Sequence, residues 1–110
     1  MLVPRTNALV SISTLEQAAD SSAINRARNI ARFLDREQCP IPFVFPTDER
    51  GIQFEWKGGR RELNLEIPSG DEPLTFLTIV DGNPALEEKI AGNIETAIRR
   101  LINWMLSPKV

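Results

Sequence analysis

The chain has 110 residues, a length that suits a single domain with one hydrophobic core. Its apolar fraction of 42% and charged fraction of 25% are typical of a folded globular protein and exclude intrinsic disorder. Thirteen basic and fifteen acidic residues give a net charge of -2, which excludes a general attraction to nucleic acid or to an anionic membrane. With no histidine, no tyrosine and one cysteine, the chain cannot build an imidazole-based catalytic triad, a histidine-ligated zinc site or an internal disulfide.

The first thirteen residues show no hydrophobic period, and we expect either a loose N-terminal arm or a short strand there. This start also lacks the charged region and the long apolar stretch of a signal peptide. The longest apolar runs, such as 74–80, fall far short of the roughly 20 residues that a membrane helix needs. We therefore expect one cytoplasmic domain spanning 1–110, without membrane contact.

The first clear element is a helix from Ala23 to about Glu37. Residues 20–22 are all of the types that favour a helix N-cap. Its apolar residues recur every three or four positions and so share one face: Ala23, Ile24, Ala27, Ile30, Ala31 and Leu34. Pro40 and Pro42 follow directly and end the helix, because proline cannot continue it.

Two alternating runs, 52–57 and 62–67, predict a β-hairpin with one buried and one wet face. A tight turn at Gly58-Gly59 would set Glu55 opposite Glu62, a pair of like charges. We favour a four-residue loop from Gly58 to Arg61, since good cross-strand pairs contribute roughly 0.2–1 kcal/mol each. That register pairs Lys57 with Glu62, Trp56 with Leu63, Phe54 with Leu65 and Ile52 with Ile67.

A third strand is predicted from Leu74 to Val80, where β-branched residues follow a turn-rich segment. Asn83 and Pro84 then have the residue types of a helix N-cap and first helical position. We expect a second helix from there to about Leu106, with its apolar residues three and four apart.

Together these elements predict an α+β fold, a three-stranded antiparallel meander with two helices packed on one face in the order α-β-β-β-α. The other face of the sheet would meet water or a partner. The open edges of such a sheet carry unpaired backbone groups, which favours dimerisation through an edge.

The segment from Pro46 to Trp56 reads P-T-D-E-R-G-I-Q-F-E-W, and L-N-L-E-I follows at 63–67. Both segments resemble a group of small uncharacterised bacterial proteins, in which a helix that ends near prolines leads into P-T-x-x-x-G-x-x-x-E-W and a strand similar to L-x-L-E-I. The resemblance implies a shared topology and a bacterial origin, in a mobile gene cassette or among toxin–antitoxin accessory genes. It implies no catalytic residue.

Glu55 and Glu66 point to one face of the hairpin from neighbouring strands, so they could serve acid/base chemistry or hold a divalent cation. In the favoured register, however, Gln53 faces Glu66 and Asn64 faces Glu55. The two carboxylates are then diagonal, and we favour a solvated sheet face.

Arg28, Arg32 and Arg36 form a stripe along one side of the first helix, with Arg60 and Arg61 as candidate neighbours. The stripe could meet an anionic partner. Because Asp35 and Glu37 are close and no aromatic residue lies between the arginines, we favour a wet helix face and expect no nucleic-acid partner.

Trp56 and Trp104 could line a ligand pocket between the sheet and the C-terminal helix, although core or interface positions suit tryptophan better. Cys39 has no histidine to activate it and is interpreted as a bystander thiol.

The leading hypothesis is a non-enzymatic interaction or binding module that acts as a homodimer or with a protein partner, and that needs no metal or other cofactor. A small-molecule domain with an apolar pocket between the sheet and the C-terminal helix is the alternative. A hydrolase that uses Glu55 and Glu66 is a third hypothesis.

Overall fold

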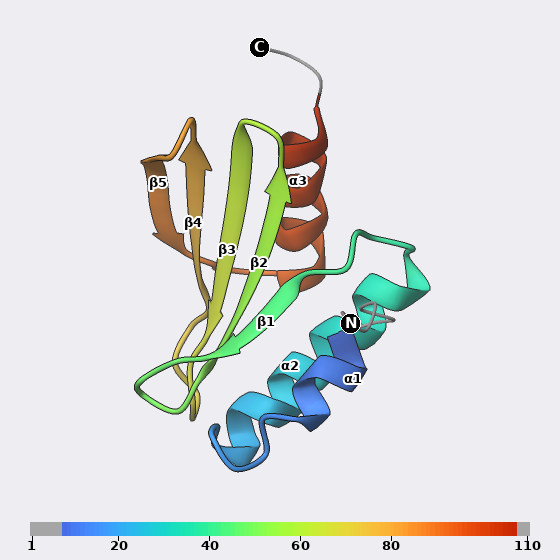
Figure 1. Ribbon diagram of the computed structural model, residues 1–110, viewed down its shortest axis with the longest axis vertical. Helices are drawn as coiled ribbons and strands as arrows, with labels where there is room; N and C mark the ends of the chain where they lie inside the picture. The colour runs from blue at the N-terminus through green and yellow to red at the C-terminus, as the bar shows by residue number, and fades with distance from the viewer. Residues whose placement is uncertain (1–7, 108–110) are drawn as a thin grey trace, which may run out of the picture.

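The computed structural model describes residues 8–107. Three helices and five strands follow one another in this part of the chain: α1 (Ala8–Ser13), α2 (Ser21–Arg36), β1 (Phe43–Pro46), β2 (Ile52–Gly58), β3 (Arg61–Ile67), β4 (Thr75–Val80), β5 (Asn83–Lys89) and α3 (Ile94–Leu106). The strands form one antiparallel sheet in the order β1-β2-β3-β4-β5 (Figure 1). None of the helices in 8–107 is long and apolar enough to cross a membrane.

The core lies between the sheet and the helices, as the alternation of the two central strands predicts. The helix-facing side chains of β2 and β3 are almost completely buried: Ile52, Phe54, Trp56, Leu63, Leu65 and Ile67. α2 and α3 contact these two strands, while α1 packs on α2 and β1. All the helices therefore cover one face, and β5 extends beyond them (Figure 1).

The register of the central hairpin is confirmed. Trp56 lies opposite Leu63, and the pairing continues one step further to Gly58 opposite Arg61. The predicted four-residue loop from Gly58 to Arg61 is therefore wrong, because these two residues are themselves paired in the strands. The connection is only Gly59 and Arg60, with Gly59 at a φ of 70° that glycine adopts without strain.

The prediction of three strands is wrong, and the first additional strand is β1. β1 follows Pro42 and ends in Pro46, and prolines this close together in a sequence argue against a strand. β1 is an edge strand that pairs only with β2, and an edge position tolerates proline because one row of backbone donors needs no partner.

The second additional strand, β5, replaces the first third of the predicted C-terminal helix. Asp81 and Gly82 both have positive φ, 52° and 80°, so they form the two-residue turn that reverses the chain into a hairpin. The helix α3 begins only at Ile94, and its N-cap is Asn93, whose side chain accepts a hydrogen bond from the Thr96 N–H at 2.9 Å.

The N-terminal region was expected to be a loose arm or a short strand, and its residues 8–13 instead form α1. Ile12 of this helix is completely buried, which anchors α1 in the core. Residues 1–7 of the expected arm lie outside the described residues.

Arg26 of α2 holds the connection between β3 and β4. Its guanidinium donates to three backbone carbonyls, those of Pro68 at 3.0 Å, Gly70 at 3.1 Å and Glu72 at 2.7 Å. The hydroxyl of Ser22 also accepts from the Gly70 N–H at 2.8 Å. The loop 68–72 is thereby fixed at one end of the sheet.

The two asparagines that precede the alternative helix starts provide a direct test of the C-terminal fold. We expect Asn93→Ala to lower the free energy of unfolding by about 0.5–2 kcal/mol, because an N-cap acceptor is lost. Asn83→Ala should change it by much less, since Asn83 is an exposed residue at the start of β5. Urea denaturation followed by circular dichroism measures both, and a larger loss for Asn83→Ala would contradict this structure.

Candidate functional site

No described helix packs on the outer face of the sheet, which is defined here as the face turned away from the helices. β2 and β3 contribute a polar central band to it, as the sequence predicts: Gln53, Glu55, Lys57, Glu62, Asn64 and Glu66. Leu77 and Ile79 of β4 lie opposite Asn64 and Glu62, so they add a partly exposed aliphatic row beside this band.

An exposed aromatic pair on β1 borders the polar band on its other side. Phe43 and Phe45 lie opposite Glu55 and Gln53, which places both rings on the outer face. They are 46% and 43% exposed, and their ring centroids are 6.5 Å apart in a stacked arrangement. Sequence reasoning missed them, although the alternation Phe-Val-Phe between two prolines carries a usable signal.

Three adjoining hollows at one end of the outer face share Glu66. The first, about 450 Å³, lies between the connections 47–51 and 68–73 and includes Lys89. The second, about 380 Å³, lies beside the ring of Phe45 and includes Asp48 and Glu49. The third, about 100 Å³, extends toward Leu77 on β4.

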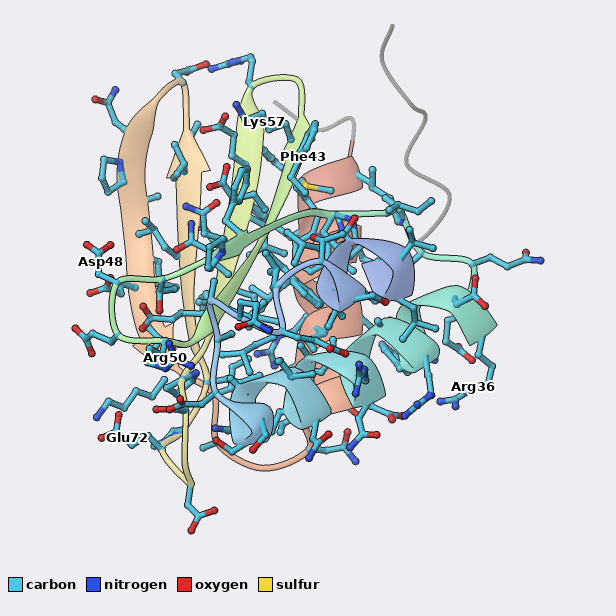
Figure 2. The ribbon with its side chains drawn as sticks, turned by 60° about the horizontal axis from the view of Figure 1, so that its bottom comes forward. Arg36, Phe43, Asp48, Arg50, Lys57 and Glu72 are labelled. Carbon is cyan, nitrogen blue, oxygen red and sulfur yellow. The ribbon has the colours of Figure 1, made fainter. Side chains whose placement is uncertain are left out.

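The charge at this end of the sheet is mostly negative. Among the described residues, Asp48, Glu49, Glu66 and Glu72 form no ion pair, and Lys89 is the basic residue that lines the hollows. Figure 2 shows Asp48 and Glu72 on the same side of the molecule, away from Arg36 at the end of α2. The outer face therefore combines exposed aromatic rings with uncompensated carboxylates.

Glu55 and Glu66 are both on this face, and the predicted diagonal is confirmed. Asn64 lies opposite Glu55, and Gln53 lies opposite Glu66. The Gln53 side-chain amide also donates to the Glu55 carboxylate at 3.0 Å, so one of the two carboxylates already has a partner. In the described part of the chain, no group of three or more acidic or cysteine side chains is placed to hold a metal ion.

The predicted arginine stripe is part of the helix surface, and each member has a contact within the chain. Arg28 pairs with Glu16 at 3.1 Å, and Arg36 pairs with Glu95 at 3.4 Å. Arg32 donates to the side-chain oxygen of Asn29 at 3.2 Å. These contacts neutralise much of the stripe, and Arg60 and Arg61 lie elsewhere, at the tip of the central hairpin.

The two tryptophans occupy different environments. Trp56 is only 2% exposed, and its indole N–H donates to the carbonyl of Pro40 at 2.8 Å, so it is a core residue. Trp104 on α3 is partly covered by Arg61, whose guanidinium lies 4.9 Å from the ring centroid.

An apolar cavity of about 190 Å³ lies between α2, α3 and the start of β4. Neither tryptophan lines it. Its apolar walls are Ile30, Phe33, Leu74, Ile94 and Ile98.

Comparison with protein families, curated sequences and solved structures finds no significant match to this chain.

The reactivity of Cys39 tests whether it is a bystander thiol. Partial burial raises its pKa, Glu37 raises it further, and Arg99 only partly offsets both effects. Because a raised pKa means less thiolate at a given pH, we expect Cys39 to react with a thiol reagent at pH 8 more slowly than the cysteine of a short unstructured peptide. Stopped-flow absorbance measures the rate of the thiol reaction, with Cys39→Ser as the blank. A rate above that of the peptide would indicate an activated thiol.

Proposed function

We propose that this protein is a non-enzymatic interaction module, which acts as a homodimer and holds a protein partner on the outer face of its sheet. The lack of histidine supports a binding role, because histidine is the side chain that most often transfers protons in catalysis. Neither tryptophan lines any of the hollows or the cavity described above.

The observation that carries the proposal is the stacked, partly exposed pair Phe43 and Phe45 on the outer face. Large aromatic side chains dominate the binding energy of protein interfaces, since they bury much apolar area at little cost in conformational freedom. Here they sit at the border of a sheet whose other face is already filled by helices. A partner that covers the outer face would bury both rings and the aliphatic row of Leu77 and Ile79 together.

The charge of the face indicates the chemistry of this partner. Lys57 is already paired with Glu62 at 3.8 Å, whereas Glu66, Glu49 and Asp48 have no ion pair among residues 8–107. A partner surface with lysine or arginine beside apolar residues is complementary to this arrangement. Nucleic acid, which is polyanionic, would be repelled.

The small-molecule alternative has the cavity between α2 and α3 as its site. At about 190 Å³ this cavity is smaller than the roughly 300–1,000 Å³ of usual ligand pockets. We therefore place the protein partner first.

A random peptide library displayed on phage tests the outer face. Peptides selected on the immobilised wild-type chain should bind Phe45→Ser at least roughly tenfold more weakly, because a central aromatic contact is removed. Lysine and arginine should be enriched among them. Leu106→Ser is the matched control, since Leu106 on α3 is an equally apolar and exposed side chain (54%) that faces away from the sheet surface in question. Its affinity for the peptides should be unchanged.

Failure to select any peptide, or equal affinity for both serine variants, would contradict an outer-face site. Unfolding curves of the two variants exclude a general loss of structure.

The homodimer is tested by size-exclusion chromatography with light scattering over a range of micromolar concentrations. We expect a mass that approaches twice that of one chain as concentration rises. A single-chain mass throughout that range would refute the dimer and leave the peptide experiment unaffected.

A further inference from the structure

The exposed edge of the sheet at β5 has a pattern that suits one particular partner strand. β5 pairs with β4 on one side, and no described strand pairs with its other edge. All seven of its residues are exposed, and Leu86 on the helix side is 48% exposed because the helices do not extend over β5. Such an edge is where an extended strand can add to a sheet.

The backbone groups that face this open edge can be identified from one hydrogen bond. The Ile90 N–H donates to the Leu74 carbonyl at 2.7 Å, which marks this pair as a hydrogen-bonded position at the end of the β4–β5 ladder. Hydrogen-bonded and non-hydrogen-bonded pairs alternate along an antiparallel ladder. The N–H and C=O groups of Glu88 therefore also face β4, and those of Glu87 and Lys89 point to the open edge.

The side chains of these two residues lie on the outer face. Glu87 is opposite Leu77 and Lys89 is opposite Thr75, both on that face. In the described part of the chain neither Glu87 nor Lys89 forms an ion pair. Glu87 and Lys89 thus each present an N–H and a C=O group to the open edge. Glu87 adds a negative charge and Lys89 a positive charge, and neither charge is paired within the described chain.

We infer that β5 pairs antiparallel with β5 of a second copy of this chain, with Glu87 opposite Lys89 of the partner subunit. This inference rests on the homodimer of the proposed function and names its interface. A twofold axis at Glu88 brings the hydrogen-bonding groups of Glu87 and the partner's Lys89 together, and symmetry repeats the pair. Each of the two symmetry-related pairs then has both backbone hydrogen bonds and an ion pair. Leu86 lies opposite the partner's Ile90.

Other self-pairing registers lack this complementarity. An axis at Glu87 sets the two Glu87 side chains against each other, and an axis at Leu86 sets Glu87 against the partner's Ala85. The register centred on Glu88 has one unfavourable contact, between the two Glu88 carboxylates on the helix side.

The residues of β5 explain why other strands would be refused. Proline and charged residues on an edge strand block unspecific pairing. Pro84 lies outside the paired stretch 86–90 and does not interfere with it. The charges of Glu87 and Lys89 lie within this stretch, and they disfavour any strand that does not place a basic residue opposite Glu87 and an acidic residue opposite Lys89. The edge is thereby selective for its own sequence.

Charge exchange across this interface is the test, with the dimer dissociation constant measured by sedimentation of the full chain. Glu87→Lys should weaken the dimer by roughly tenfold or more, since two attractive pairs become repulsive. Lys89→Glu should do the same, and the double exchange Glu87→Lys with Lys89→Glu should restore the wild-type value. Glu88→Gln should tighten the dimer by roughly two- to threefold, because the central repulsion is removed.

Asp35→Lys, an equal charge change on an exposed residue of α2, is the control and should leave the constant unchanged. A wild-type dimer that is insensitive to Glu87→Lys, or a double exchange that fails to restore it, overturns this interface while the homodimer itself stands. A monomeric wild-type chain overturns both. Circular dichroism of each variant confirms that it is folded.

Discussion

The structure depends on one constraint, which is that the alternating apolar side chains of β2 and β3 must be removed from water on a single face. Phe54 and Leu65 lie opposite each other, as do Trp56 and Leu63, and all four are buried. Covering them takes the helices α2 and α3, and the indole N–H of Trp56 needs the carbonyl of Pro40 as its acceptor once it is buried. Because the described helices all pack on this side, no helix among residues 8–107 covers the opposite face of the sheet.

Ion pairs and hydrogen bonds tie together the connections at the two ends of the sheet. At one end Arg26 fixes the loop 68–72 by three carbonyl contacts. At the other, Arg60 and Asp81 form a bidentate pair that joins the tips of the two hairpins, and the hydrogen bond from Arg60 holds the pKa of Asp81 below its usual range. A surface ordered in advance loses less conformational freedom when a partner binds, which favours recognition over a flexible loop site.

The sequence predicts the parts of this fold whose signals are local and mutually consistent. The β2–β3 register follows from the periodicity of two and from the charges at Lys57 and Glu62, and α2 follows from its apolar spacing. β5 was missed because Asn83, Pro84 and the following glutamates satisfy the rules for a helix start, while the turn at Asp81-Gly82 decides otherwise. β1 was missed because its prolines argue against a strand, and with it the aromatic half of the candidate site, Phe43 and Phe45. The polar half, including Glu55 and Glu66, was placed correctly because it depends only on the hairpin.

The proposed β5 interface would also constrain how a dimer uses its outer faces. A twofold axis perpendicular to the sheet would join two five-stranded sheets into one of ten strands, with both outer faces continuous across the junction. Neighbouring strands rotate by about 20°, so nine successive steps turn the two β1 strands by roughly 180° relative to each other. In such a dimer the Phe43 and Phe45 pairs at the two far ends would face nearly opposite directions. One large flat partner could not cover both, and a dimer of this kind would hold two separate partners and bring them to a fixed distance from each other.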